Sequence, residues 1–186
     1  MTCARTTLST SEARRETVIA SALAVFAQTG YLGTPVAAVA THAKISPAYV
    51  FKLFPSKESL FVAALTRCFE LVREALDEGA QRSTENTPDA ILWTMGEAYA
   101  ELIANRDLLL LQVHAQSAAT VPEIGSALRD GLGAITTFAK SRSGASDEAV
   151  QRFIAYGQLC HLIVTSGIED ATEPWAMILT NGMRHF

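Results

Sequence analysis

Hydrophobic residues recur three and four positions apart along most of the chain, which is the spacing of amphipathic helices. The first predicted helix begins at a capping box, Ser9 to Glu12, and ends near Gln28, just before Gly30, which suits a left-handed stop. One inward stripe runs along this helix: Ile19, Ala22, Leu23 and Phe26. No segment has a convincing strand pattern, so the sequence predicts an all-α fold.

Two short helices joined by a tight turn are predicted next. Thr34 is expected to cap the first, with Pro35 at its first helical position. After a turn at residues 42–45, Ser46 repeats the capping signal and opens the second short helix. Apolar residues occupy one face of this helix, and the opposite face carries Pro47, Ala48, Tyr49 and Lys52.

That opposite face suits close contact with nucleic acid. Small residues at the start of the helix permit close approach, while Tyr49 and Lys52 offer stacking, hydrogen bonds and phosphate contacts. These are the properties of a recognition helix that enters a major groove with its N-terminal end first. Lys57 follows the next predicted N-cap, Ser56, at a helix N-terminus that favours a phosphate oxygen.

The rest of the chain is predicted to form a larger helical bundle. We expect a disordered tail at residues 1–8, a helix-turn-helix domain at 9–55, a connecting helix at 56–80 and a second domain at 81–186. The polar stretch Gln81 to Pro88 is the clearest linker, and the last helix is expected to begin near Pro174 and extend to Phe186. Apolar residues cover more than one face of the final two helices, which favours a homodimer through them over burial in one subunit's core.

Charge is distributed unevenly over the 186 residues, whose net charge is −4. Residues 1–57 contain six basic and two acidic side chains, a net +4, whereas the remainder contains nine basic and seventeen acidic ones, a net −8. A positive end on an acidic body favours a polyanion at that end. The alternative is chance asymmetry between two helical domains.

Several short motifs together resemble the N-terminal DNA-binding domain of TetR-type transcriptional regulators. They are Phe26 to Tyr31, Thr34, Ile45-Ser46 and Phe54 to Leu60, within a match of roughly Arg14 to Leu65. The resemblance implies an N-terminal helix-turn-helix and a C-terminal helical bundle that binds a ligand and dimerises. It also implies two partners, a palindromic double-stranded operator and a small-molecule effector.

The predicted DNA-contacting residues combine this resemblance with the exposed helix face: Thr34, Lys44, Ser46, Pro47, Ala48, Tyr49, Phe51, Lys52 and Lys57. Two depart from the family pattern. Lys44 stands where relatives usually have glycine, so a left-handed backbone there would cost about 1 kcal/mol. Phe51 replaces a frequent tyrosine and lacks its hydroxyl.

An effector pocket is expected among the helices after residue 88. Its candidate lining residues are Trp93, Met95, Tyr99, His114, Phe138, Phe153, Tyr156 and His161. Such a lining suits a flat or apolar small molecule, and the alternative for each residue is core packing. We predict no metal site, cofactor or catalytic residue, because no ligand-like histidine spacing and no enzyme motif is present.

The sequence therefore predicts a cytoplasmic, ligand-responsive DNA-binding transcriptional regulator, and we expect a repressor that is released from its operator by a small hydrophobic effector. No apolar run reaches the length of a membrane span. The rival is a helical small-molecule-binding or scaffold protein with a vestigial helix-turn-helix. Net negative charge and the few base-reading side chains favour that rival.

Overall fold

Every regular element within residues 10–182, the part of the chain that its computed structural model describes, is a helix. The predictions for Ser9 and for the tail at residues 1–8 lie outside this range. The elements in chain order are α1 (Thr10–Gly33), α2 (Val36–His42), α3 (Pro47–Leu53), α4 (Lys57–Arg82), α5 (Pro88–Ile103), α6 (Arg106–Ser117), α7 (Pro122–Ser143), α8 (Asp147–Ser166), the 3-10 turn η1 (Ile168–Asp170) and α9 (Pro174–Thr180). The predicted all-α fold is confirmed.

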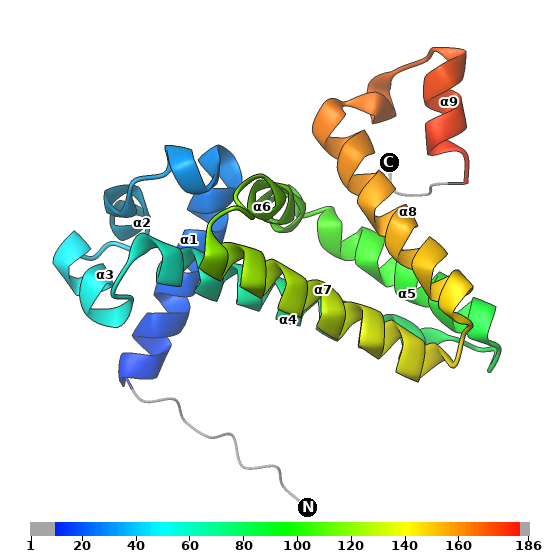
Figure 1. Cartoon of the computed structure of the whole chain (residues 1–186), viewed down its shortest axis with the longest axis horizontal. Helices are drawn as coiled ribbons and strands as arrows, with labels where there is room; N and C mark the ends of the chain where they lie inside the picture. The colour runs from blue at the N-terminus through cyan, green and yellow to red at the C-terminus, as the bar shows by residue number, and fades with distance from the viewer. Residues whose placement is uncertain (1–9, 183–186) are drawn as a thin grey trace, which may run out of the picture.

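Helices α1, α2 and α3 form a small unit at one end of an elongated molecule (Figure 1). The predicted inward stripe of α1 is buried, and Phe26 at its end is inaccessible to solvent. The ring of Phe26 meets Phe61 of α4 edge-on at 4.9 Å between centroids, and Tyr31 meets the same ring at 5.6 Å. This aromatic cluster fixes the small unit to the first turns of α4.

The junction between α1 and α2 differs from the prediction. Helical geometry breaks at Gly30, with φ 70° and ψ 179°, and a further helical turn continues to Gly33. The residue before α2 is Pro35, whose side chain cannot cap, so the prediction that Thr34 is the N-cap is wrong. The Thr34 hydroxyl instead donates to the Gly30 carbonyl at 2.7 Å, because the kink removes that carbonyl from the helical ladder.

The other helix boundaries follow the predicted caps more closely. The predicted caps Ser46 and Ser56 each accept a hydrogen bond from a backbone N–H in the first turn of the following helix, and Thr87 and Ser146 do the same for α5 and α8. The predicted linker at residues 81–88 is shorter than expected, because α4 continues through Arg82. Arg82, at the end of this two-residue extension, forms ion pairs with Glu78 at 3.7 Å and Glu101 at 2.7 Å.

The larger body is built around α4, which packs along α5 and α7 (Figure 1). Glycines allow these helices to approach closely. A Cβ on Gly131 of α7 would lie 2.1 Å from the Phe69 ring of α4, and one on Gly79 would lie 2.5 Å from the Thr94 carbonyl oxygen of α5. One continuous hydrophobic cluster joins the small unit to the body, running from α1 through α4 to α8.

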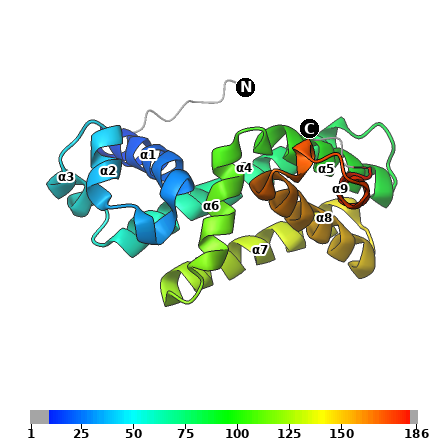
Figure 2. The same ribbon diagram turned by 90° about the horizontal axis from the view of Figure 1, so that it is seen from above.

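Helix α6 lies near the middle of the molecule, between the small unit and the C-terminal helices (Figure 2). Near its start, Gln28 of α1 donates to Asp107 at 2.8 Å, and Arg106 donates to the Val164 carbonyl of α8 at 2.7 Å. One helix therefore contacts both the small unit and the element that leads to the C-terminal segment. Within residues 10–182, no helix is long and apolar enough to cross a bilayer.

Candidate nucleic-acid interface and effector cavity

Helix α3 has one buried and one accessible face. Val50 and Phe54 are buried against the core of the small unit, and Leu53 is half-buried. The predicted contact residues Ser46, Pro47, Ala48, Phe51 and Lys52 are exposed, and Tyr49 is half-buried. The face of α3 that is predicted to contact nucleic acid is therefore the accessible one.

The turn before α3 holds Lys44 in a left-handed conformation, with φ 56°. It is the single non-glycine residue with positive φ among the residues that the structure describes. The backbone N–H of Lys44 donates to Thr41 and that of Ile45 to Ala40, which close the turn between α2 and α3. The Lys44 side chain is exposed at this turn, where it and Lys52 make no ion pair within the described part of the chain.

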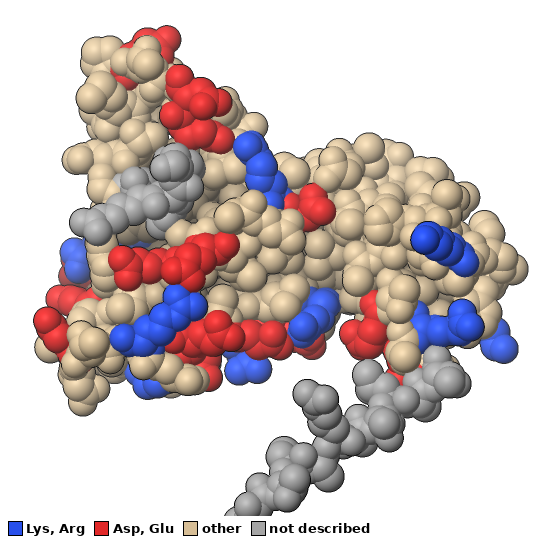
Figure 3. All heavy atoms as spheres, turned by 180° about the vertical axis from the view of Figure 1, so that it is seen from behind, with Lys and Arg blue, Asp and Glu red and all other residues tan. Residues whose placement is uncertain are grey.

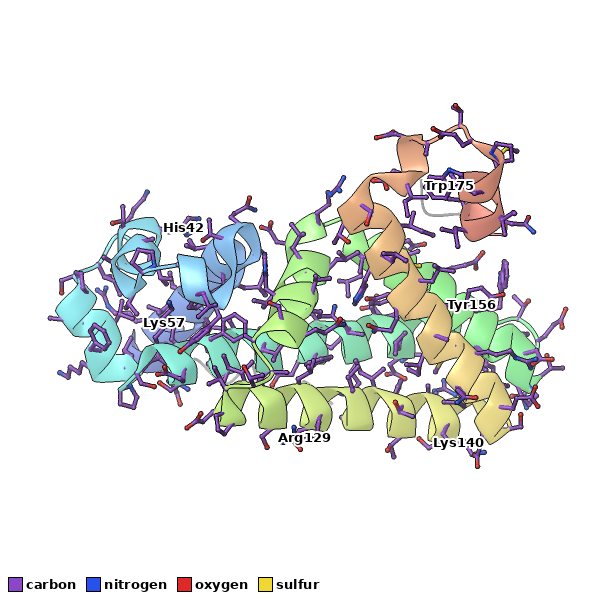
Figure 4. All side chains as sticks on the ribbon, turned by 45° about the horizontal axis from the view of Figure 1, so that its top comes forward. His42, Lys57, Arg129, Lys140, Tyr156 and Trp175 are labelled. Atoms are coloured by element: carbon purple, nitrogen blue, oxygen red, sulfur yellow. The ribbon has the colours of Figure 1, made fainter. Side chains whose placement is uncertain are left out.

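Two other basic residues of this region bind within the protein. The Arg15 guanidinium donates to the Leu53 carbonyl at 3.1 Å and lies over the Phe54 ring at 4.2 Å. Arg15 therefore joins α1 to the end of α3. The Lys57 ammonium donates to the Leu32 carbonyl at 3.4 Å and lies 4.7 Å from the Tyr31 ring centroid, so it supports the end of α1 (Figure 4).

Thr34 differs from the other predicted contact residues because its side chain is 1% exposed. Its hydroxyl is also 2.6 Å from that of Thr29. Thr34 therefore stabilises the bend between α1 and α2 and presents no hydroxyl to a polyanion. This corrects its assignment as a contact residue.

A pair that the sequence reading missed lies next to Lys57. The Tyr31 hydroxyl donates to the Glu58 carboxylate, and this hydrogen bond raises the pKa of Tyr31 to about 12 and lowers the pKa of Glu58. The contact joins the end of α1 to the first turn of α4. Both residues belong to the motifs that carry the family resemblance, which was the available signal.

Charge separates along the molecule as the sequence predicted. The end that carries α3 shows mainly basic side chains, whereas the larger body shows many acidic side chains interspersed with basic ones (Figure 3). On the body many of these acids lie beside basic groups; for example, Arg67 of α4 bonds Glu70 and Glu74, each at 3.1 Å. The net field still favours approach of a polyanion to the α3 end.

The larger body contains a cavity of about 420 Å³, within the size range of small-molecule sites. It lies between α5 and α8, with α4, α6 and α7 contributing to its walls. Apolar and aromatic side chains form most of the lining, among them Val72, Leu76, Leu92, Trp93, Tyr99, Leu132, Ile135, Phe153, Ile154 and Tyr156. Two glycines, Gly96 and Gly157, leave room beside the rings of Phe153 and Tyr99.

Half of the predicted lining residues lie in this cavity: Trp93, Tyr99, Phe153 and Tyr156. The others do not line it. Met95 is fully buried core, and Phe138 lies under the Arg73 guanidinium at 5.9 Å. His114 lies next to the Ala27 carbonyl, with its Nε2 at 3.2 Å, so it packs against α1 instead.

His161 lies behind the cavity wall and reaches it through Tyr99. The Tyr99 hydroxyl and His161 Nε2 are 2.6 Å apart, and burial lowers the pKa of His161 to about 4. The sequence reading missed Gln112, which also lines the cavity. A glutamine following four leucines on a buried helix was the signal that could have revealed it.

A second exposed surface lies at the far end of the molecule. Trp175, Met177 and Ile178 of α9 are 54%, 64% and 75% exposed, and Leu162 of α8 is 51% exposed. Helix α9 packs on η1 and α8 around a separate small cluster that includes Ile163 and Ala176. Figure 4 shows Trp175 here, at the opposite end from the small unit.

Residues 18–64 match the model of bacterial regulatory proteins of the tetR family. No curated protein matches the chain by sequence. This chain therefore carries the N-terminal DNA-binding domain of TetR-type regulators, over α1 to the start of α4.

Solved structures share the fold over most of the chain. A TetR-family transcriptional regulator from Agrobacterium tumefaciens is 14% identical, with a TM-score of 0.69 over 91% of this chain and 93% of its own. The transcriptional regulator FadR from Bacillus subtilis, in complex with stearoyl-CoA, is 16% identical, with a TM-score of 0.68 over 89% and 93%. A TetR-family regulator from Bordetella parapertussis is 18% identical, with a TM-score of 0.63 over 92% and 96%.

These likenesses establish a common fold that includes the bundle beyond the matched domain. The N-terminal domain of this chain thus matches the tetR family, and the whole chain shares the fold of solved TetR-family transcriptional regulators.

Proposed function

We propose that the protein is a dimeric repressor that leaves its operator when a small, mainly apolar effector binds in the larger body. Residues 9–55 would bind DNA, residues 56–80 would connect, and residues 81–186 would bind the effector and dimerise. Such a repressor acts on DNA in the cytoplasm. The observation that carries the proposal is the accessible face of α3, on which Lys52 is exposed and Tyr49 is half-buried.

In this proposal α3 enters a major groove with its N-terminal end first. Ser46, Pro47 and Ala48 allow close approach, Tyr49 and Lys52 contact bases or phosphates, and Phe51 contacts thymine methyl groups or sugars. Lys44 adds a phosphate contact from the turn. Lys57 would act mainly by supporting the end of α1, because its ammonium already contacts Leu32 and Tyr31.

A helix-turn-helix usually binds as a dimer, with half-sites about 34–36 Å apart or a multiple of that spacing. We propose that α8 and α9 form the dimer contact with their counterparts. Their exposed apolar residues support this, since a large exposed apolar patch on a soluble protein usually marks an interaction surface. For both α3 helices to reach one duplex, the two small units of this dimer must lie on the same side.

Two helices could transmit effector binding to α3. Helix α4 lines the cavity with Val72 and Leu76, and its N-terminus directly follows α3. Helix α6 lines the cavity with Gln112 and touches α1 two residues later through His114. We propose that the effector favours a tilt of α4, and with it α6, that changes the spacing of the two α3 helices. Such a ligand shifts the population away from the DNA-binding state.

The rival, a helical small-molecule-binding or scaffold protein with a vestigial helix-turn-helix, predicts no specific DNA affinity. The purified full-length protein would be used to select binding sites from random double-stranded DNA. A selected palindrome bound with an affinity that falls steeply with salt supports the repressor, because released counterions report phosphate contacts. Recovery of no preferred sequence, or an affinity independent of salt, contradicts it.

A further inference from the structure

The buried end of the cavity carries an incomplete hydrogen-bond network. Tyr99 and Gln112 both line the cavity, and His161 stands behind Tyr99 with its Nε2 2.6 Å from the hydroxyl. His161 is 4% exposed. Its Nδ1 is buried and has no hydrogen-bond partner among the residues that the structure describes.

The orphaned Nδ1 determines which way the shared hydrogen bond runs. If Tyr99 donated to Nε2, the neutral imidazole would carry its hydrogen on Nδ1, as a buried and unpaired N–H donor, which is rare in proteins. If Nε2–H donates to Tyr99, Nδ1 is left only with an unpaired acceptor, which is the smaller penalty. We therefore assign the hydrogen to Nε2, so the Tyr99 O–H is free to donate into the cavity.

The network is uncharged. Burial lowers the pKa of His161 to about 4, so its ring is neutral near pH 7. Burial raises the pKa of Tyr99, and the Gln112 amide beside the hydroxyl opposes that rise. The Gln112 amide nitrogen also donates to the Leu108 carbonyl at 3.1 Å, which fixes the side chain against the wall.

The charged residues of the lining do not favour an anion. Arg152 is the one basic residue among the described residues of the lining, and it pairs with Glu148 at 3.5 Å on an exposed surface. Two exposed acids, Asp89 and Glu97, lie on the same rim. An anionic group at the buried end would lose its hydration without gaining a cation, which is costly.

We propose that the cavity takes a neutral, mainly apolar molecule with a single oxygen acceptor, of the ketone or ester class, which accepts a hydrogen bond from Tyr99. The idea that this molecule is the effector rests on the proposed function; its binding in the cavity does not. The Bacillus subtilis FadR structure of similar fold holds stearoyl-CoA. The phosphates of such a ligand would need several cations, and the described lining of the present cavity offers Arg152 alone.

A set of eight-carbon probes tests the head-group preference on the unmodified protein. Calorimetric titrations at pH 8 would compare 2-octanone, octanoate, octyltrimethylammonium and octanoyl-CoA. The proposal predicts that 2-octanone binds at least tenfold more tightly than each of the other three. Tighter binding of octanoate, octyltrimethylammonium or octanoyl-CoA overturns it, and so does the absence of 2-octanone binding to the folded protein.

Two substitutions test the assigned position and contact. Tyr99→Phe keeps the ring and removes the donor, and should weaken 2-octanone binding about three- to tenfold, while the matched change Tyr31→Phe, at the junction of α1 and α4 outside the cavity, should alter it less than twofold. Gly157→Leu, which fills the cavity, should abolish binding. If Tyr99→Phe binds 2-octanone as the native protein does, or if Gly157→Leu still binds it, the proposal is wrong.

Operator binding gives a separate readout. If 2-octanone binds with the predicted preference but leaves DNA affinity unchanged, the cavity inference stands and the release mechanism fails. If the protein binds DNA specifically but prefers octanoyl-CoA in the cavity, the regulator proposal stands and the inference about the head group fails.

Discussion

Gly30 of α1 lies directly against the ring of His114 of α6, so that a Cβ on the glycine would be 2.8 Å from His114 Nδ1. Gly30 also has φ 70°, which a residue with a side chain rarely adopts. This is where the small unit meets the helix that crosses from the body. Close packing here leaves little freedom for α1 to move without α6.

Gly30→Ala should lower the free energy of unfolding by about 2 kcal/mol, through backbone strain and the clash with His114. Gly33→Ala, three residues on, is the control, because its Cβ would meet nothing closer than Thr29 at 3.4 Å. Urea unfolding of both variants makes the comparison. Adding His114→Ala should recover part of the loss; equal stability of the two glycine variants would contradict this account.

The parts of the fold set by local interactions could be predicted from the sequence. Ser46 and Ser56 cap their helices because a cap needs only its own side chain and the next turn. Thr34 also carries a hydroxyl that could cap a helix, but the kink at Gly30 leaves a carbonyl nearby that accepts a hydrogen bond from this hydroxyl. This competing acceptor is created by the fold of the chain, so no local sequence pattern predicts it.

The cavity was only partly predictable because its lining depends on how helices pack. Trp93 and Met95 are two positions apart on α5, yet Trp93 lines the cavity and Met95 is fully buried in the core. Both are large apolar residues, so residue type alone does not distinguish a lining position from a core position. The position of His114 against α1 likewise depends on the crossing of α6, which no local signal specifies.

Lys44→Gly should raise the free energy of unfolding by about 0.5–1 kcal/mol. It removes the cost of a left-handed lysine, and the greater flexibility of glycine in the unfolded chain offsets part of the gain. Lys44→Ala is the control, since it removes the charge but keeps the strain, and its stability should stay near that of the native protein. If thermal or urea unfolding shows that Lys44→Ala is as stable as Lys44→Gly, relief of backbone strain is not the cause of the gain.

Stability should depend on pH through His161. Its pKa is about 4 in the folded protein and near 6.5 when unfolded, so the unfolded chain takes up the proton first as pH falls. The contribution of His161 to the free energy of unfolding is fully present above pH 6.5. It is lost between pH 6.5 and 4, which lowers the free energy of unfolding by roughly 3 kcal/mol.

Urea unfolding at pH 7.5 and 4.5 measures this change. His161→Gln should reduce the difference between the two pH values, whereas His42→Gln, at an exposed histidine, should not. An equal pH dependence in the native protein and the His161 variant would contradict the assigned cause.

Ile178→Glu should convert the dimer to a monomer, because it places a charge in the proposed contact of α8 and α9. Light scattering after size exclusion should give the native protein about twice the 20.0 kDa chain mass and the variant a single chain mass. Leu32→Glu is the control, since Leu32 is 86% exposed at the other end of the molecule. Native protein that elutes as a monomer would rule out this dimer.

The contact between α3 and DNA is tested most directly by the affinity of the Lys52→Ala variant for the selected operator at fixed salt. The charge-matched control is Arg129→Ala, on the exposed face of α7 in the body (Figure 4). We predict at least tenfold weaker binding and a smaller salt dependence for Lys52→Ala, and a further loss when Tyr49→Ala is added. Arg129→Ala should bind near the native value. If the Tyr49→Ala, Lys52→Ala double variant binds the operator as tightly as the native protein, the exposed face of α3 is not the DNA-binding surface.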